Sequence, residues 1–316
     1  MLLNKFQSVK IAGKLILPFQ QKQHLRWASS SLPKYEIPSK RLPVYNGFLL
    51  DTRAKGEREV IEPEWKSKIE GFKKPLRIEI IDRKDYVFIG QYFTWHFSKF
   101  CNIFECQKLK YDEAAPIFFN TLNSLIDKPL SFAAFEGDKL VGIFLSTFYT
   151  FDEFPLKYPR GLYDENPKFV IQKDYGQDIT NGPFPSRKAN RCYLFIDECI
   201  SQTGKFLPKD CKKLSIIRST CVHPKYMKSG LAQFLTYKAV ELFKKHECDY
   251  WLSYSLAAAA AGFNLKINGK ELFEFPYEDF KDDGKSVFTN MCDGAKSLKT
   301  ILGKVDEAWP LVQRYS

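Results

Sequence analysis

The first regular pattern of apolar and polar positions begins at Leu76 and predicts a strand followed by a helix. In the sequence LRIEII, apolar side chains alternate with Arg77 and Glu79, which is the two-residue period of a half-buried strand. Asp82 follows, and its carboxylate can accept the free N–H groups of a first helical turn. Beyond it, apolar residues recur at helical spacing and predict one buried stripe. Its members are Ile89, Phe93, Phe97, Phe100 and Phe104.

A second helix is predicted from Asp112 to about Ile126, and a hairpin comes after it. Its two apolar runs lie in SFAAFEGDKLVGIFLSTFY and are separated by a Gly-containing turn at 136–139. The segment 151–188 is rich in Pro, Gly, Asp and Tyr and predicts a long loop, of the kind that often carries function. A helix over about 190–203 is expected next.

From residue 213 onward, predicted strands and helices alternate. KLSIIRSTCV predicts a strand, the residues after Gly230 an amphipathic helix, DYWLSYS another strand, and LAAAAAGFNLKI a small-residue helix. KELFEFPYEDF and KSVFTNM predict the last strands. This order indicates an α+β fold built on a mixed sheet, with antiparallel pairs early in the chain and a parallel pair after residue 213. We expect one domain over 76–316.

The residues before Leu76 show no clear periodicity. Residues 32–75 carry Pro, Tyr and mixed charge, and we interpret them as a linker or arm laid against the domain. The first 35 residues hold six Lys and Arg and no acidic residue. Basic, Ser-containing, acid-free N-termini are typical of organellar transit peptides. We therefore predict a mitochondrial transit peptide over residues 1–31, the alternative being a basic tail on a cytoplasmic protein.

Composition narrows the class of protein. The chain has 316 residues, 16% of them aromatic, which favours a packed globular core. No run approaches the ~18 consecutive apolar residues of a membrane-spanning helix, so no membrane partner is expected. The net charge of +11 is concentrated at the N-terminus and is weak support for nucleic-acid binding. Eight cysteines without a C-x-x-C pair and four histidines in no ligand pattern imply no metal.

The stretch STCVHPKYMKSGLAQFLTYKAVELF carries the clearest chemical signal. A strand runs into a His-Pro turn and a short loop, and a helix begins after Gly230. Gly230 and Ala232 lack bulk, so a ligand can approach the backbone closely. The free N–H groups at the positive end of the helix dipole suit a phosphate or pyrophosphate, and Lys228 adds a positive charge. The simpler alternative is that Gly230 only starts the helix.

The sequence VHPKYMKSGLAQFL resembles motif A of the GNAT acyltransferase superfamily, [QR]-x-x-G-x-[GA], in register over 227–232. The resemblance continues on both sides and is similar to the arylalkylamine N-acetyltransferase branch. LRIEIIDRKDY, the aromatic helix and FAAFEGDKLVGIFLS match its N-terminal half, and the sequence from the helix after Gly230 to NGKELFEFPYEDFKDDGKSVF matches its C-terminal half. Tyr277, Asp279 and Phe280 stand in a Tyr-x-Asp-Tyr-like segment. The resemblance covers roughly 76–300.

This resemblance implies transfer of an acyl group from acetyl-CoA, or another acyl-CoA, to the amine of a small molecule by direct attack on the thioester. It also implies a GNAT-like mixed sheet with splayed parallel strands. The pyrophosphate would lie on the backbone of Met227, Lys228, Ser229, Gly230, Leu231 and Ala232. The thioester carbonyl would accept hydrogen bonds from amides around Cys221 and Val222. A base must then take the proton of the amine, whose free pKa is ~10.

The sequence departs from the branch at the acid–base positions. Met227 replaces the usual Gln or Arg of motif A. The branch's catalytic glutamate falls at Cys101-Asn102-Ile103. Its two serines fall on Leu256 and Ala260, and the superfamily's tyrosine falls near Asn264. The residues that bind the cofactor are therefore expected at the family's usual positions, whereas the residues that transfer protons are not.

Several residues are candidate replacements, each with a simpler alternative. Glu105 is the nearest carboxylate and would act through water, unless it is a surface residue. Ser253 and Tyr254 end the strand that should face the acyl group, but either side chain can point into the core instead. Cys101 and Cys221 are candidate nucleophiles or inert buried thiols. His96 and His223 are interpreted as structural. Residues available for an apolar acceptor pocket are Phe93, Trp95, Phe97, Phe148 and Tyr149, of which the last two neighbours cannot both face it.

Three functions follow from these features. The first is an acyl-CoA-dependent N-acyltransferase acting on a small amine. The second is an acyl-CoA-binding protein of impaired catalysis that serves as a sensor or interaction module, which the substituted glutamate and serines favour. The third, a nucleic-acid-binding protein, rests on net charge alone. The sequence does not identify the acceptor amine, the acyl length or the oligomeric state.

Overall fold

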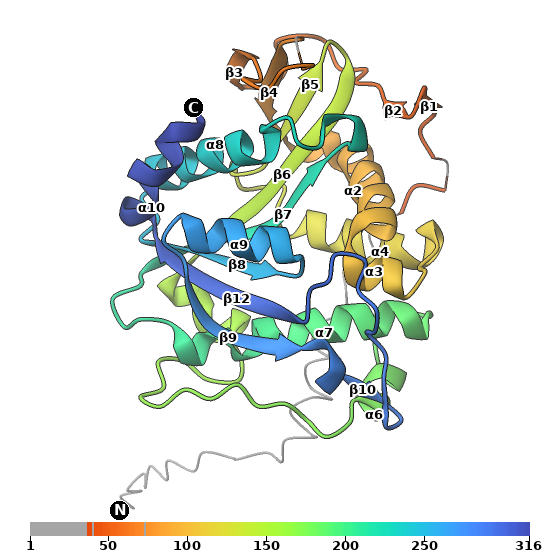
Figure 1. Ribbon diagram of the computed structural model, residues 1–316, viewed down its shortest axis with the longest axis vertical. Helices are drawn as coiled ribbons and strands as arrows, with labels where there is room; N and C mark the ends of the chain where they lie inside the picture. The colour runs from red at the N-terminus through yellow and green to blue at the C-terminus, as the bar shows by residue number, and fades with distance from the viewer. Residues whose placement is uncertain (1–36, 40, 73) are drawn as a thin grey trace, which may run out of the picture. The chain divides into compact units, whose positions relative to one another are not determined.

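An eight-stranded sheet is the main element of the computed structural model, which describes residues 37–316 except 40 and 73 (Figure 1). The strand order is β3-β4-β5-β6-β7-β8-β12-β9. These strands are β3 Val60–Trp65, β4 Leu76–Ile80, β5 Phe132–Glu136, β6 Lys139–Thr150, β7 Lys213–Val222, β8 Tyr250–Ser255, β9 Lys270–Pro276 and β12 Ser297–Lys304. Two short pairs lie outside it: β1 Val44–Tyr45 with β2 Phe48–Leu49, and β10 Lys281–Asp282 with β11 Lys285–Ser286. The transit peptide predicted for residues 1–31 lies outside the described residues.

The predicted mixed sheet is confirmed. Every neighbouring pair of its strands is antiparallel except β7 and β8, which are parallel. A parallel pair needs a long crossover connection, which α8 Leu231–Lys245 provides between β7 and β8. The predicted strand 213–222 and the hairpin formed by β5 and β6 are present as expected.

Helices cover both faces of the sheet. The further helices are α2 Tyr86–Phe100, α3 Asn102–Cys106, α4 Tyr111–Asn123, α5 Phe154–Lys157, α6 Gly176–Thr180, α7 Arg187–Thr203, α9 Ala258–Lys266 and α10 Val305–Val312. Buried side chains of α8, α9 and α10 join one apolar cluster with β4, β5 and β6. A second cluster joins residues of β6, β7 and β8 to Phe154 and Tyr158 of the long 151–188 segment. In Figure 1, α2, α3 and α4 lie together on the right of the sheet.

The aromatic stripe predicted after Asp82 is interrupted in the structure. Asp82 does cap the turn before α2, accepting from the Lys84 amide at 2.8 Å. Helix α2 ends at Phe100 because Cys101 is extended, and Phe104 belongs to the separate helix α3. Ile89, Phe93 and Phe104 are buried, but Phe100 is 41% exposed, so its expected burial was wrong. The turn at Cys101 points the Asn102 side chain towards β8 instead of extending the stripe.

The last part of the sheet also differs from the prediction. KSVFTNM forms only the two-residue strand β11, whereas the unpredicted strand β12 lies between β8 and β9. Most β12 residues are buried, because Ile301 packs in the cluster of α8, α9 and α10 and Leu302 packs in the cluster of Phe154 and Tyr158. Such a strand shows no apolar–polar alternation and gives little sequence signal. The helix α10 that follows it was likewise not predicted.

The arm before Leu76 adds a strand to the sheet. β3 pairs with β4, and its register shifts twice, which explains the missing periodicity. Arg58 fastens this arm from a buried position. Its guanidinium forms ion pairs with Asp51 at 2.7 Å, Glu79 at 3.0 Å and Asp85 at 2.7 Å. Burial raises the pKa of Asp51, but the hydrogen bonds from Arg58 outweigh it, so that pKa is lowered from its ordinary 3.8.

Replacing Arg58 by methionine should therefore lower the free energy of unfolding by about 3–5 kcal/mol, because it leaves buried carboxylates unpaired. Urea unfolding followed by circular dichroism measures the change. Lys84→Met is the control, since its side chain is 74% exposed beside Glu57, and should cost less than about 0.5 kcal/mol. Equal effects of the two substitutions would contradict the role of Arg58.

The lowered pKa of Asp51 contributes stability that is present above about pH 4, and this contribution is lost as the pH falls through the folded-state pKa of Asp51.

Candidate functional site

Strands β7 and β8 stay together for only four residue pairs. Their pairing runs from Leu214 with Tyr250 to Ile217 with Ser253, and β7 then continues to Val222 without β8. Its other edge stays paired with β6 as far as Val222 with Gly142, apart from a register shift at Leu145–Ser146. The parallel strands are thus splayed, as the sequence resemblance implied.

The splay leaves backbone groups of β7 facing the opening. The His223 amide donates to Val141 at 2.8 Å, so the pair formed by Val222 and Gly142 is a non-hydrogen-bonded one. The amide of Val222 therefore points away from β6, into the splay, and by alternation that of Thr220 does as well. The Cys221 amide points to β6. Val222 and Cys221 were both expected to hold a thioester carbonyl. The register directs the amide of Val222 into the splay and that of Cys221 away from it.

The bend between β7 and α8 presents free amides. Lys228 and Gly230 both have left-handed backbone, at φ 63° and 84°. Within the described chain, the amides of Lys228, Gly230, Ala232 and Gln233 have no hydrogen-bond partner, while Ser229 Oγ accepts from the Leu231 amide at 3.2 Å. A left-handed residue beside a helix N-terminus forms a concave cluster of N–H groups that suits an anion. Glycine at 230 is needed for its φ rather than for space, since an added Cβ would meet only Ile69 at 3.9 Å.

The arm lies against one side of this bend. Ser67 Oγ donates to the Ser229 carbonyl at 2.5 Å, and the Trp65 ring stacks on Phe234 with centroids 4.9 Å apart. Ser229 is consequently only 2% exposed, whereas Met227, Lys228 and Ala232 are exposed. The outer part of the bend stays accessible to a ligand.

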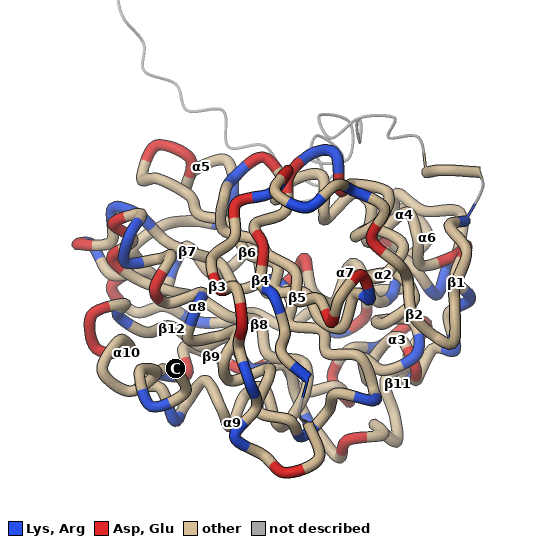
Figure 2. The backbone as a smooth tube through the Cα atoms, turned by 90° about the horizontal axis from the view of Figure 1, so that it is seen from above, with Lys and Arg blue, Asp and Glu red and all other residues tan. Residues whose placement is uncertain are grey.

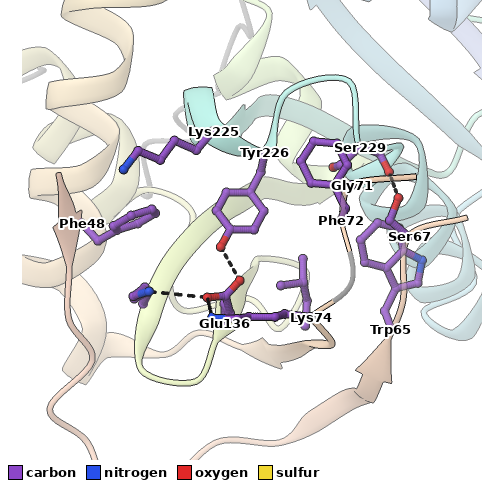
Figure 3. Close-up of a pocket in the computed structure, with 12 residues that line it drawn as sticks. Phe48, Trp65, Ser67, Gly71, Phe72, Lys74, Glu136, Lys225, Tyr226 and Ser229 are labelled. Atoms are coloured by element: carbon purple, nitrogen blue, oxygen red, sulfur yellow. Dashed lines mark hydrogen bonds and ion pairs between the residues drawn. The ribbon is translucent and has the colours of Figure 1, made fainter. Parts of the chain in front are cut away.

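A cavity of about 440 Å³ adjoins the bend between the arm and the β5–β6 turn (Figure 3). Its walls are Phe48, Trp65, Ser67, Gly71, Phe72, Lys74, Leu76, Glu136, Lys139, Lys225, Tyr226 and Ser229. Glu136 lies 3.3 Å from Lys74 and 3.5 Å from Lys139, and it accepts from the Tyr226 hydroxyl at 2.5 Å. Three lysines against one acid leave a net positive charge beside the free amides. This favours an anionic ligand at the bend.

A polar cluster closes the far side of the splay, where β8 ends. Asn102 Nδ2 donates to the Leu256 carbonyl at 2.7 Å and lies 3.2 Å from both the Tyr277 hydroxyl and Asp293 Oδ1. Asp293 Oδ2 accepts from the Ala258 amide at 3.0 Å, at the start of α9. Asp293 is exposed, and burial, with Cys221 of β7 nearby, raises the pKa of Cys101 next to Asn102. The cluster therefore brings a carboxylate to the splay that the sequence analysis did not single out.

The candidate side chains at the end of β8 divide between the two faces of the sheet. Ser253 Oγ lies 3.2 Å from Ser255 Oγ, which accepts from Asn264 Nδ2 of α9 at 3.0 Å. Tyr254 points to the other face, where its hydroxyl lies 3.0 Å from Thr203 Oγ1 of α7. Ser253 and Tyr254 consequently cannot act on the same face of a bound ligand. Of the aromatic residues considered for an acceptor pocket, Tyr149 is on the Tyr254 side and Phe148 is on the α8 side.

Glu105 lies one helical turn after Asn102 and is partly exposed. Burial raises the pKa of the Cys292 thiol, and Asp293 and then Glu105 add to this effect. Glu105 belongs to the periphery of the Asn102 cluster, and no side-chain hydrogen bond fixes it among the described residues.

The histidines and the two candidate thiols are enclosed. His223 stacks on Phe48 with centroids 4.2 Å apart, and its Nε2 lies 3.1 Å from the Gly47 carbonyl, so it joins the arm to the turn before the bend. Burial, helped by His223, lowers the pKa of His96 to about 4, and that ring is neutral at physiological pH. Burial raises the pKa of Cys221 to about 12 and also raises that of Cys101. Neither thiol supplies a thiolate for a covalent acyl intermediate.

Charge is mixed over the described chain. In Figure 2, Lys and Arg alternate with Asp and Glu around the backbone instead of forming a single basic face. In the described ranges, no helix is long and apolar enough to cross a membrane. The same residues contain no group of three His, Cys, Asp or Glu that could hold a metal ion.

The thiol environments predict the order of alkylation. Cys292 is exposed, so iodoacetamide should label it first in the native protein at pH 8, whereas the buried Cys221 should react only after unfolding. Peptide mass spectrometry over a time course measures this order, and Cys292→Ser should remove the fast phase. Rapid labelling of Cys221 in the native protein would contradict its burial and make it a candidate nucleophile again.

Comparison with known proteins gives a fold. No family model and no curated protein matches the sequence. Among solved structures, arylalkylamine N-acetyltransferase 2 from Aedes aegypti is similar, with a TM-score of 0.59 and 16% identity over 73% of this chain and 99% of that one. The Drosophila melanogaster polyamine N-acetyltransferase has a TM-score of 0.56 and 10% identity, over 72% and 99%. A mosquito arylalkylamine N-acetyltransferase like 5b has a TM-score of 0.53 and 10% identity, over 72% of this chain and 99% of that one. The chain thus has the fold of the GNAT acetyltransferases and is structurally similar to the arylalkylamine N-acetyltransferases.

Proposed function

We propose that the protein transfers an acetyl or other acyl group from acyl-CoA to an amine of a small molecule. The observation that carries this proposal is the splay of β7 and β8, with unpartnered amides at its open end. The diphosphate of the cofactor would bind the amides of Lys228, Gly230 and Ala232. Its thioester carbonyl would accept from Val222 or Thr220 inside the splay. The solved relatives include proteins named as acetyltransferases of arylalkylamines and polyamines, which supports an amine as acceptor.

The residues present fit such a cofactor. A diphosphate needs several converging donors and positive charge, and the bend supplies both, together with the lysines of the adjoining cavity. The cofactor supplies an activated acyl group when bound. The chain's own contribution is to orient the thioester along β7 and to stabilise the oxyanion that forms when the amine attacks.

We assign the removal of the amine proton to Asp293, directly or through water. Its carboxylate is held by the Asn102 amide group and by the Ala258 amide, at the end of the strand beside the splay. Glu105 is the alternative base, and the chain formed by Ser253, Ser255 and Asn264 is available on the α9 side to return a proton to the thiolate.

A second function, an acyl-CoA-binding protein of impaired catalysis, is favoured by one observation. An amide, Asn102, stands where the related branch carries its catalytic glutamate, and its hydrogen bonds tie it to the protein itself. Under this alternative the cofactor binds and no amine is acylated.

The anion site can be tested with a charge at the helix start. Ala232 is exposed at the second position of α8. Ala232→Glu should leave the free energy of unfolding unchanged or raise it by about 0.3–1 kcal/mol, because a negative charge near a helix N-terminus is stabilising. It should weaken CoA binding about 100-fold through repulsion of the diphosphate. Ala232→Gln, of the same shape without the charge, is the control.

Isothermal titration with CoA and thermal unfolding measure the two quantities on the same samples. Unchanged CoA affinity in Ala232→Glu would place the diphosphate elsewhere. Absence of CoA binding by the unsubstituted protein would refute both functions.

The base can be tested with two matched amides. With acetyl-CoA and a panel of amines, Asp293→Asn should lower kcat by about 100-fold or more and leave the KM for acetyl-CoA unchanged. Glu105→Gln should change kcat little. A thiol reagent that detects released CoA measures turnover. The pH profile of kcat/KM then distinguishes loss of the base from loss of structure. The reverse ranking would assign the proton transfer to Glu105, and CoA binding without turnover of any amine would support the second function.

A further inference from the structure

Arg218 is the least expected charge in the structure. It lies on β7 directly after Ile217, the last residue paired with β8, and at the register shift between β7 and β6. An extra residue at such a shift re-aims its side chain, and these irregularities are frequent beside active sites. The Arg218 side chain accordingly points to the face of Tyr149 and Tyr254, with its guanidinium 6.0 Å from the Tyr254 ring.

Among the residues that the structure describes, no acidic side chain neutralises this guanidinium. Its Nε is buried without a hydrogen-bond partner, and no Asp or Glu of the described chain forms an ion pair with it. The groups around it are tyrosines: Tyr149 from β6, whose side chain forms a hydrogen bond with the guanidinium, Tyr158 after α5 and Tyr254 from β8. The buried Arg58, by contrast, has three carboxylate partners. Arg218 is partly exposed, but its Nε is removed from water and the guanidinium has no acidic partner, which is destabilising and calls for an explanation.

A second polar group is left unpaired at the same place. The Tyr158 side chain is only 2% exposed, and its buried hydroxyl has no hydrogen-bond partner within residues 37–316 as the structure describes them. Tyr158 belongs to the same cluster as Tyr149, and Tyr254, whose ring lies 6.0 Å from the Arg218 guanidinium, packs against that cluster. A trapped water would satisfy the hydrogen bonds of both groups, but it brings no negative charge. An anionic group satisfies both requirements.

We propose that Arg218, with Tyr149 and Tyr158, binds the carboxylate of the acceptor, so that the acceptor is an amino acid rather than a plain amine. This rests on the proposed acyl transfer. The planar guanidinium suits a carboxylate, which can accept two of its N–H groups together, and the Tyr158 hydroxyl adds a third donor. Arg218 is partly exposed, so the site is in contact with solvent.

The position agrees with an acceptor site. Arg218 precedes Thr220 by two residues on the strand that would hold the thioester. It also lies on the face covered by Tyr158 of the 151–188 segment and by Thr203 of α7, opposite the apolar cluster of α8. The diphosphate would bind at the N-terminus of α8, so the acceptor could approach the thioester from the Arg218 side while the cofactor enters at the bend.

The test compares amines that differ only by a carboxylate: tyrosine with tyramine, tryptophan with tryptamine, and arginine with agmatine. With acetyl-CoA, the protein should acylate the acid member of at least one pair with a kcat/KM about 100-fold above that of its decarboxylated partner. Arg218→Met should remove this preference without changing the KM for acetyl-CoA. Arg218→Lys should retain part of it, and Tyr158→Phe should reduce it several-fold. Arg314→Met, at the chain end, is the control.

The variants are expected to fold, since Arg218→Met replaces a partly buried charge that has no acidic partner by an apolar chain of similar length. If no acceptor is turned over, isothermal titration of the same pairs into the CoA-saturated protein decides the proposal by binding. Equal activity or binding for both members of every pair would overturn it, as would a preference that survives Arg218→Met. Succinyl-CoA carries a carboxylate on its acyl chain. If Arg218→Met lowers activity with succinyl-CoA but not with amino-acid acceptors, the acceptor assignment is overturned and Arg218 binds the carboxylate of the acyl chain instead. Failure of CoA to bind would instead refute the acyl transfer.

Discussion

The separation of β7 from β8 is the constraint on which the rest of this structure depends. Up to Ile217 the two strands satisfy each other's backbone groups, and beyond it they do not. Buried amides without partners are costly, so the opening has to be lined with polar groups or occupied by a ligand that accepts hydrogen bonds. The surrounding elements are arranged accordingly. The bend into α8 presents amides at one end, the Asn102 cluster closes the side of β8, and the register shift turns Arg218 towards the tyrosines.

Local chemistry made much of this predictable from the sequence. The strand 213–222, the His-Pro turn, Gly230 and the helix after it are specified by residues next to one another, and the structure has all of them. The hairpin of β5 and β6 and the cap at Asp82 are likewise local. The fold class followed from the order of these elements, and the similarity to solved acetyltransferases confirms it.

The parts that sequence reasoning missed depend on contacts between distant residues. β12 is enclosed on both faces and has no alternation, and β3 is irregular because its register shifts. Asn102 and Asp293 are 191 residues apart, and no periodicity links a turn after α2 to a loop before β12. The division of Ser253 and Tyr254 between two faces follows from strand alternation, but which face carries which residue is fixed only by α7 and α9. An unpaired arginine is also invisible in sequence, because pairing is a property of the folded protein.

The ring of His223 lies between Phe48 of the arm and Trp95 of α2, with centroid distances of 4.2 and 5.7 Å. Three segments therefore share one aromatic stack: the N-terminal arm, the first long helix and the turn that leads to the bend before α8. This arrangement limits how far the arm can be shortened. A truncation that stops before β1 keeps Phe48, whereas one that extends beyond Phe48 removes one side of the stack and leaves the turn before α8 without that support.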